Sequence, residues 1–279
     1  MPIRMAQRSR VAVVEIHGVI GNQVKISEFA HVIDSLSNNR RIQAVLLDID
    51  SPGGSATGSE VLYRSVQRVA ASKPVYAYVR GIGASGGYYV ACAASKIYAL
   101  PTALIGSIGV IYLRPILQEL LAKVGIDLSV YKSGEFKDMT GFWRSPTDRE
   151  SQKFQELINE IFDNFVAVVA VGRSLDDSVV REIATGEVMT AQRGKNCGLV
   201  DEIGDFKDAL EGAAEIARCK PIPRWIRPSR SLRQRLIGRS GILQETPGQT
   251  LIAGLERVMS GGIYYLEPGH IGSSDFSFR

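Results

Sequence analysis

The sequence predicts an α/β fold in which βαβ units stack around a mostly parallel sheet. Several short apolar runs lack polar alternation, which is typical of strands buried on both faces. Amphipathic helical patterns separate these runs, and strand–helix alternation favours a parallel sheet between layers of helices. Hydrophobic residues make up 45% of the 279 residues, which is enough for a sizeable core.

The individual elements follow from these patterns. The expected strands are Val11–Ile16, Ala44–Ile49, Pro74–Val79 and Leu128–Lys132. Helical apolar faces are expected at Ile26, Phe29, Ala30, Ile33 and Leu36, within Val24–Asn38, and at Val61, Leu62, Ser65, Val66 and Val69. The longest helix candidate is Pro146–Val171, with Ser145 as its N-cap. The uncharged run Ile97–Leu113 is interrupted by proline and glycine, so we expect two buried strands and a turn there.

Residues 81–89 contain the most informative motif, Gly-Ile-Gly-Ala-Ser-Gly-Gly-Tyr-Tyr. It places Ser85 on a turn between a strand and a helix, where a serine is expected to stay exposed. The N–H of Gly86 is then free at the start of the helix. These residues can supply a nucleophile and an oxyanion donor for acyl transfer.

Gly81, Gly83 and Gly86 also fit the glycine fingerprint of dinucleotide-binding folds. That fingerprint requires an acidic residue about 20 positions later. The first acid after the motif is Glu119, which disfavours this interpretation. The glycines can equally be structural and allow a helix to pack closely on the sheet.

A second glycine motif follows the buried run Ala44–Ile49, at Pro52-Gly53-Gly54. Adjacent glycines let backbone N–H groups turn toward a bound carbonyl at no steric cost. Gly53 could therefore give a second oxyanion donor beside Gly86. An ordinary strand–helix turn is the alternative.

The base is harder to identify. None of the histidines, His17, His31 and His270, lies in a glycine-rich or acid-paired context, so we interpret them as structural or solvent-facing. A neutral lysine can replace histidine if its pKa falls from about 10.4 to about 7–8, a cost of about 4 kcal/mol. Burial among apolar neighbours can supply this. Lys137 and Lys132 are the candidates, and the residues alone do not choose between them.

Five motifs in order support a family resemblance. They are Asp50–Gly54, Gly83–Tyr89, Ile105–Val110, Lys132–Asp138, and Gly186–Ala191 leading into Gly198–Gly204. The combination resembles the protease IV or signal peptide peptidase A family of serine–lysine peptidases, in its short single-unit form. The resemblance implies the crotonase/Clp protease fold, with a peptidase domain over residues 1–217 and a basic amphipathic C-terminal extension over residues 218–279.

The resemblance also implies a role for each site residue. Ser85 would be the nucleophile and Lys137 the general base. Gly53 and Gly86 would be the oxyanion donors, and Ser107 would hydrogen-bond and orient the lysine. The expected activity is endopeptidase cleavage of short or extended peptides, including signal-peptide remnants at the membrane.

No cofactor or metal is expected. The cysteines Cys92, Cys197 and Cys219 show neither the spacing of metal ligands nor a disulfide framework. They indicate a reducing compartment or core packing.

The extension bears on localisation. Arg218–Arg239 contains eight basic residues and no acid, with apolar residues interleaved, which suits an anionic membrane surface. A solvated or subunit-contacting arm is the alternative, and the lack of a recognised nucleic-acid motif disfavours nucleic acid. Met1–Arg10 has charges but no apolar core, so no signal peptide or anchor is expected there. We expect membrane association, either peripheral or through an anchor missing from this chain, and otherwise a cytoplasmic protein.

Assembly and function remain open to alternatives. Short members of this family resemble one half of the long, duplicated ones, which implies a homo-oligomeric ring with sites shared between protomers. An acyl-CoA hydratase or isomerase on the same superfold would need an acidic base and leave Ser85 and Lys137 without a purpose. A non-catalytic peptide-binding scaffold is the third function class.

Overall fold

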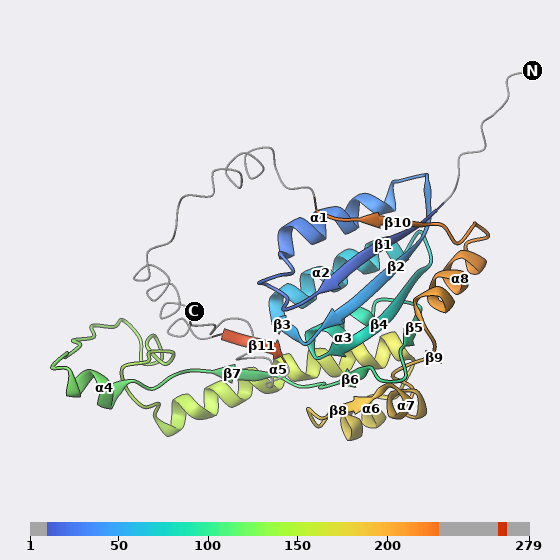
Figure 1. Ribbon diagram of the computed structural model, residues 1–279. Coiled ribbons are helices and arrows are strands. Elements are labelled where there is room, and N and C mark those ends of the chain that lie inside the picture. The colour runs from blue at the N-terminus through green and yellow to red at the C-terminus, as the bar shows by residue number, and fades with distance from the viewer. Residues whose placement is uncertain (1–9, 229–261, 267–279) are drawn as a thin grey trace, which may run out of the picture. The chain divides into compact units, whose positions relative to one another are not determined.

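The computed structural model describes residues 10–228 and 262–266, which divide into two compact units (Figure 1). Unit 1 contains residues 10–110, 164–228 and 264–266 of this part, and unit 2 contains residues 111–163 and 262–263. The boundary falls inside the longest helix. We describe each unit by itself.

Unit 1 is an α/β structure around a mostly parallel sheet, as the strand–helix alternation predicts. The strand order is β10-β1-β2-β4-β5-β9, and β6 pairs with both β4 and β8. Every pairing in this sheet is parallel except that of β6 with β8. The strands are β1 (Arg10–His17), β2 (Ile42–Ser51), β4 (Val75–Ala84), β5 (Lys96–Ala99), β6 (Leu104–Gly106), β8 (Val188–Thr190), β9 (Glu202–Ile203) and β10 (Pro223–Ile226).

Helices cover both faces of this sheet (Figure 1). They are α1 (Ile26–Ser37), α2 (Ala56–Ala70), α3 (Gly86–Ala91), the end of α5 (Asp148–Arg173), α6 (Asp177–Ile183), α7 (Ala191–Asn196) and α8 (Phe206–Ile216). On one face, α8 packs Ala209 and Ala213 against Val11, Val13 and residues of β2 and β4. The alternate residues of β1, such as Ala12 and Val14, are equally buried. The apolar runs therefore form strands that are covered on both sides, as predicted.

A smaller pairing lies beside the main sheet. β3 (Gly53–Ser55) pairs with β11 (Gly262–Leu266), and the two strands are antiparallel. Tyr264 lies opposite Ser55, and Tyr265 lies opposite Gly54. A segment from near the C-terminus thus runs along the strand that follows the Pro-Gly-Gly turn.

Unit 2 consists of β7 (Ile111–Leu113), α4 (Gln118–Lys123), the first part of α5 and irregular segments. Leu128–Lys132 is not a strand, so that prediction is wrong. These residues are exposed and have no partner strand in the described part of the chain. An apolar run forms a strand only where a neighbour accepts its backbone hydrogen bonds.

Two further predictions need correction. The cap of α5 is Thr147 rather than Ser145: Thr147 Oγ1 accepts from the Glu150 N–H at 3.2 Å, and the Glu150 carboxylate accepts from the Thr147 N–H at 2.8 Å. This is a capping box, which satisfies two N–H groups at once. The run Ile97–Leu113 forms parts of three short strands, β5, β6 and β7, rather than two.

The helices of the described ranges all fall short of the length and apolar character that a membrane crossing requires. Within the same ranges, no three His, Cys, Asp or Glu side chains gather as a metal site would require. Residues 229–239, which carry half of the basic charge of the predicted membrane-binding segment, lie outside the described residues.

Candidate active site

The predicted site residues of unit 1 meet at one edge of the sheet. β4 pairs in parallel with β2 and with β6. Gly53 comes shortly after β2, Ser85 directly after β4 and Ser107 directly after β6. Because the strands are parallel, their carboxyl ends lie at the same edge, which is where ligands bind in open α/β sheets.

Ser85 has a backbone conformation that few residues other than glycine adopt, with φ 52° and ψ −118°. Its N–H donates to the Gly106 carbonyl at 2.7 Å, and its own carbonyl accepts from the Tyr89 N–H at 2.8 Å. Such a backbone costs about 1–3 kcal/mol and persists only where its surroundings hold it. This strained strand-to-helix turn has the geometry of a nucleophile elbow.

The Ser85 residue is 1% exposed, so the expectation of an exposed serine is wrong. The carbonyl oxygen of Tyr265 on β11 lies against Gly53 and Gly86, next to the turn. The Ser85 hydroxyl makes no hydrogen bond to a residue that the structure describes. The turn is therefore covered, and its hydroxyl is not committed to another group there.

The two predicted oxyanion glycines lie side by side. A Cβ atom on Gly53 would lie 2.7 Å from the Gly86 nitrogen, and one on Gly86 would lie 3.2 Å from the Gly53 Cα. Gly53 also has φ 103°, where a side chain would be strained. The Gly53 N–H donates to Ser51 Oγ at 3.2 Å, whereas the Gly86 N–H donates to none of the described residues. Only glycines fit at this close approach.

Ser107 lies on the turn that adjoins Ser85. Its φ is 50°, it is 5% exposed, and its N–H donates to the Glu187 carbonyl at 2.8 Å. The preceding residue, Gly106, accepts the Ser85 N–H. The structure thus brings Ser85, Ser107 and both glycines together within unit 1.

The predicted base, Lys137, belongs to unit 2. Its backbone N–H donates to the Gly134 carbonyl at 3.2 Å within a turn, and its side chain is exposed. Unit 2 by itself therefore does not bury the amine. Lys132, the competing lysine, is committed elsewhere: its Nζ donates to Asp138 Oδ1 at 2.6 Å and to the Glu135 carbonyl at 2.9 Å.

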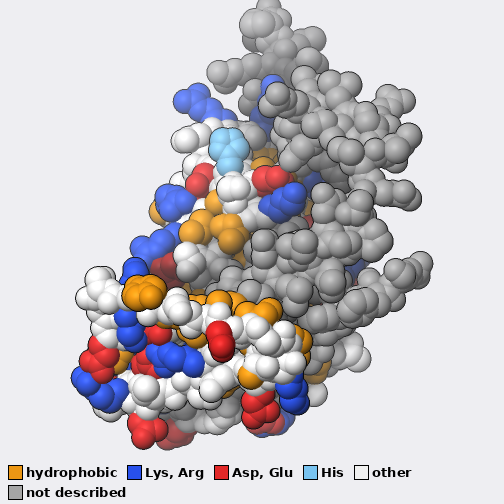
Figure 2. Space-filling view, turned by 90° about the vertical axis from the view of Figure 1, so that its left-hand side faces the viewer, with side chains coloured by type: hydrophobic (Ala, Val, Ile, Leu, Met, Phe, Trp, Pro, Cys, Tyr) orange, Lys and Arg blue, Asp and Glu red, His pale blue; other side chains and the backbone are white. Residues whose placement is uncertain are grey.

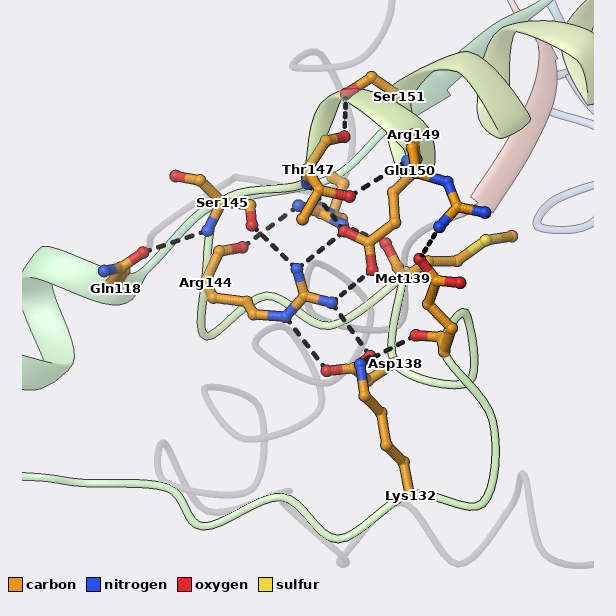
Figure 3. A network of polar contacts seen from close by, with 12 residues as sticks. Gln118, Lys132, Asp138, Met139, Arg144, Ser145, Thr147, Arg149, Glu150 and Ser151 are labelled. Carbon is orange, nitrogen blue, oxygen red and sulfur yellow. Dashed lines mark hydrogen bonds and ion pairs between the residues drawn. The ribbon is translucent and has the colours of Figure 1, made fainter.

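Asp138, which follows Lys137, belongs to a charged network centred on Arg144 (Figure 3). The guanidinium lies between two carboxylates and donates to Asp138 Oδ2 at 3.1 Å and to Glu150 Oε2 at 2.8 Å. Arg144, and then Lys132, hold the pKa of Asp138 well below its usual range. The hydrogen bond from Arg144 lowers the pKa of Glu150 to about 2. Both carboxylates are buried, so the network fixes the segment that carries Lys137.

This network was not predicted from the sequence. Asp138, Arg144 and Glu150 are six residues apart in each step, which does not place them on one face of a helix, and the segment from Asp138 to Arg144 is irregular rather than a strand. One signal was present, because Thr147 followed three residues later by Glu150 is the sequence signature of a capping box.

A third buried carboxylate belongs to the sheet of unit 1. Asp48 on β2 accepts from Arg80 Nη2 at 2.6 Å, and His17 Nε2 lies 3.6 Å from it. Burial raises the pKa of Asp48, but the nearby His17 and the hydrogen-bonded Arg80 outweigh this and lower it. The contact with Asp48 raises the pKa of His17. His17 thus has an ionic structural partner, although the sequence showed no acid beside it.

The dinucleotide interpretation does not fit the geometry. Gly81 and Gly83 lie inside β4, and the N–H of Ile82 between them donates to Asp50 Oδ1 at 3.0 Å. Only Gly86 begins a helix. The fingerprint needs its glycines in a tight turn around a phosphate, and such a turn is absent from this segment.

Comparisons with known proteins agree with the predicted fold and with the family resemblance. The family model of Peptidase family S49 matches residues 67–220, and that of Clp protease matches residues 7–106. A protein of Synechocystis sp. that is named as a protease is 35% identical over 222 residues, which cover 79% of this chain and 79% of that protein. The chain belongs to peptidase family S49.

Other relatives agree with this membership. An Enterococcus faecium protein named signal peptide peptidase SppA is 31% identical over 217 residues, which cover 74% of this chain and 63% of that protein. An alanine mutant of the 1510-N membrane-bound stomatin-specific protease shares the fold, with a TM-score of 0.52 and 18% identity over 80% of this chain and 99% of that one. This S49 chain is a serine peptidase with a Clp-like fold.

Proposed function

We propose that this S49 peptidase is an endopeptidase in which Ser85 is the nucleophile and Lys137 the general base. The observation that carries the proposal is the strained Ser85 turn beside the paired glycines Gly53 and Gly86. A nucleophile on such a turn, with backbone N–H groups next to it, is what attack on a peptide carbonyl requires.

The reaction proceeds in two stages. Uncharged Lys137 takes the hydroxyl proton while Ser85 Oγ attacks the carbonyl carbon. The N–H groups of Gly53 and Gly86 stabilise the oxyanion, each by about 3 kcal/mol. The protonated lysine then gives its proton to the departing amine, and the peptide C–N bond breaks. Water hydrolyses the acyl-enzyme with the same base. Ser107, on the adjoining turn, orients the lysine.

Lys137 must lose its exposure to act as a base, because solvent favours the charged ammonium. A second copy of the chain provides the cover in this proposal, within a homo-oligomeric ring. Unit 2 supports it by exposing many apolar side chains, and Figure 2 shows a face on which such side chains lie between charged ones. The exposed apolar side chains of unit 2 are Leu113, Ile116, Leu120, Val124, Ile126, Leu128, Val130, Tyr131 and Leu157.

The substrates are extended peptides, including remnants of signal peptides at a membrane surface. The name of the Enterococcus faecium relative supports this substrate class. The strand β3, which pairs with a segment of the chain itself beside the Ser85 turn, supports binding of a substrate as an extended strand. The basic segment 218–239 would hold the enzyme at anionic lipid, and vesicle sedimentation in rising salt tests that contact.

A fluorophosphonate probe tests the mechanism, because it labels only an activated serine. We expect label on Ser85, and its loss in Ser85→Ala and in Lys137→Ala. Lys123→Ala, which removes a lysine from α4 in the same unit, is the matched control and keeps the label.

The other function classes give different results. A scaffold without catalysis takes up no label in any variant, and an acyl-CoA enzyme keeps its activity in Lys137→Ala. Either outcome would overturn the serine–lysine mechanism.

A further inference from the structure

Six basic side chains gather at the amino edge of the sheet in unit 1, which is the edge opposite the candidate active site. Strands β1, β2, β4 and β10 are parallel, so they all begin at this edge, on the right-hand side of Figure 1. The segments that lead into three of them, residues 38–43, 72–74 and 216–222, contain no Asp or Glu. The basic residues of this edge are Arg10, Arg40, Arg41, Lys73, Arg218 and Lys220.

Hydrogen bonds hold these segments together. The Arg10 N–H donates to the Arg41 carbonyl at 3.2 Å, which joins the starts of β1 and β2. Lys73, just before β4, donates from its Nζ to the Asn39 carbonyl at 2.8 Å and also to the Leu36 carbonyl. The segment before β10 lies on the other side of β1, because β10 pairs with β1 along its whole length. The basic residues therefore belong to one continuous surface.

The charge of this surface is not neutralised by acidic neighbours. Within residues 10–228 and 262–266, none of the six basic side chains forms an ion pair with a carboxylate. Elsewhere in unit 1, by contrast, Arg68, Arg80 and Arg173 each pair with an aspartate. Glu215 is the acidic residue next to these segments in the chain, and it is exposed. Unpaired charge of one sign creates a potential that attracts anions.

The surface is hollowed where α1, α2 and α8 end. A hollow of about 480 Å³ lies there, and Arg40 and Lys73 line it beside hydroxyl and amide side chains. Ile42, Pro74 and Ile216 add apolar walls, and no carboxylate lines it. Ile216 is 60% exposed. Basic groups beside exposed apolar ones are typical of surfaces that bind the headgroups of anionic lipids.

Lys73 has the most definite geometry of the basic residues. Its ammonium lies at the end of α1, where the negative end of the helix dipole favours a cation. An ammonium has three N–H donors and two of them are used, so one remains for a ligand in the hollow. Burial lowers the pKa of Lys73, and an anion beside it would favour its charged form.

We propose that the amino edge of the sheet is the surface through which this enzyme contacts a bilayer of anionic lipid, with a lipid phosphate in the hollow that Arg40 and Lys73 line. The occupant follows from charge complementarity, because the surface is basic and such a bilayer has a negative surface potential. The inference rests on the membrane contact in the proposed function and gives it a place in the folded chain. It is independent of the Ser85–Lys137 mechanism.

This orientation restricts the substrates. β4 begins beside the hollow and ends at Ser85, and its ten residues span about 33 Å at about 3.3 Å each. Contact through the amino edge therefore holds the Ser85 turn about 30 Å from the lipid headgroups. The enzyme then acts on peptides that have left the bilayer rather than on segments still embedded in it.

Vesicle sedimentation of the full chain tests the surface with the double variant Arg40→Ala/Arg41→Ala. Neither side chain makes a hydrogen bond to a residue that the structure describes, so we expect the variant to fold. Each basic residue near an anionic bilayer contributes about fivefold to binding, so affinity for vesicles of phosphatidylglycerol and phosphatidylcholine should fall by about 20-fold. Vesicles of phosphatidylcholine alone should bind neither chain.

The charge-matched control is Lys25→Ala/Lys207→Ala. Lys25 precedes α1 and Lys207 is in the first turn of α8, whereas the hollow lies where these helices end. At about 1.5 Å per residue both charges are about 13 Å or more away along the helices, beyond a Debye length of about 8 Å. The control should keep its vesicle affinity. Equal losses in the two double variants would assign binding to net charge and overturn the surface.

Hydrogen exchange locates the contact and its occupant. Anionic vesicles should slow exchange of the backbone amides in residues 38–43 and leave residues 84–87 unchanged. Protection of residues 84–87 instead would overturn the orientation. Binding to a single-stranded oligonucleotide or to free glycerol phosphate, without binding to vesicles, would overturn the bilayer as the occupant.

A variant of the basic extension separates this inference from the proposed function. Arg233→Ala/Arg235→Ala removes two charges from the extension alone. Loss of vesicle affinity in that variant, with none in Arg40→Ala/Arg41→Ala, would sink the inference and leave the proposed membrane contact standing. No affinity of the unchanged chain for anionic vesicles would remove both. Fluorophosphonate labelling of Ser85 reports on the peptidase mechanism in either case.

Discussion

Ser85 and Ser107 are both held in the left-handed region of backbone space, with φ 52° and 50°. They follow strands β4 and β6, which are paired in parallel, and Gly106 links the two turns through its hydrogen bond from Ser85. A strained backbone of this kind persists only where the surrounding structure holds it in place. Such strain clusters at functional sites. The two turns therefore constrain each other.

Replacing Ser85 by glycine should separate catalysis from stability. Ser85→Gly relieves strain of about 1–3 kcal/mol, against an entropic cost of about 0.5–1 kcal/mol. We expect Ser85→Gly to melt about 2–4 °C above Ser85→Ala, which keeps the strained backbone. Both variants should be inactive. Equal melting temperatures would mean that the turn is not strained.

Gly53 offers a second test at the level of one residue. In Gly53→Ala the new Cβ would meet the Gly86 nitrogen and the Tyr265 carbonyl oxygen, so the oxyanion site cannot keep its form. We expect kcat to fall by about 100-fold or more, as for the loss of an oxyanion donor. Steady-state kinetics measure the effect.

The matched control for that variant is Gly186→Ala. Gly186 also has a positive φ, 82°, but a Cβ there would meet nothing within 4 Å. The Gly186→Ala variant should be less stable because of backbone strain, but its kcat should be unchanged. A similar loss of kcat in both variants would attribute the effect of Gly53→Ala to strain rather than to the oxyanion site.

At the scale of elements, the network around Arg144 fixes the segment that joins the loop carrying Lys137 to α5. Glu150 stabilises it twice, through the capping box with Thr147 and through its ion pair with Arg144. Arg144 also donates to the carboxylate of Asp138, which is next to Lys137 in the chain. The loop that carries the proposed base is thus attached to a helix by buried charges rather than by an apolar core.

The ionisation of Glu150 should therefore appear in the pH dependence of stability. Its pKa in the folded chain is about 2, below the unfolded value of 4.5. Its stabilising contribution is complete above pH 4.5 and is lost as the pH falls from 4.5 toward 2. Glu150→Gln should melt below the unchanged chain at pH 6, with a difference that shrinks below pH 4.5. A difference independent of pH would assign the effect to packing.

The elements show what the sequence could predict and what it could not. β1 and β2 were predictable because their apolar runs are long and covered on both faces. Leu128–Lys132 has a similar composition, but a strand also requires a partner, which composition does not reveal. The turns that carry Ser85, Gly53 and Gly86 were predictable from local sequence, whereas the roles of these residues stay predictions. The burial of Ser85 was not, because it depends on which distant segments pack around the turn, and local sequence does not show this.

At the scale of the whole molecule, the proposed nucleophile and the proposed base belong to different compact units. The family resemblance supplied Lys137, and the structure adds that Lys132 is already paired with Asp138. Which copy of the chain supplies the lysine to a given serine is a property of the assembly. A mixing experiment addresses it directly.

Co-expression of Ser85→Ala and Lys137→Ala chains should restore activity if sites are shared between copies. Each variant alone should be inactive. In a random 1:1 ring, about a quarter of the sites would receive an intact serine and an intact lysine. Titration of labelled Ser85 measures this fraction. If both residues of a site come from one chain, the mixture stays inactive.

The tether of β11 has a consequence for how the enzyme responds to its surroundings. Because β11 and β3 belong to one polypeptide, their encounter does not depend on protein concentration, and the local concentration of a tethered segment is on the order of millimolar. Dilution would therefore leave the pairing in place, and another strand could add at the same edge of β3 only by displacing β11.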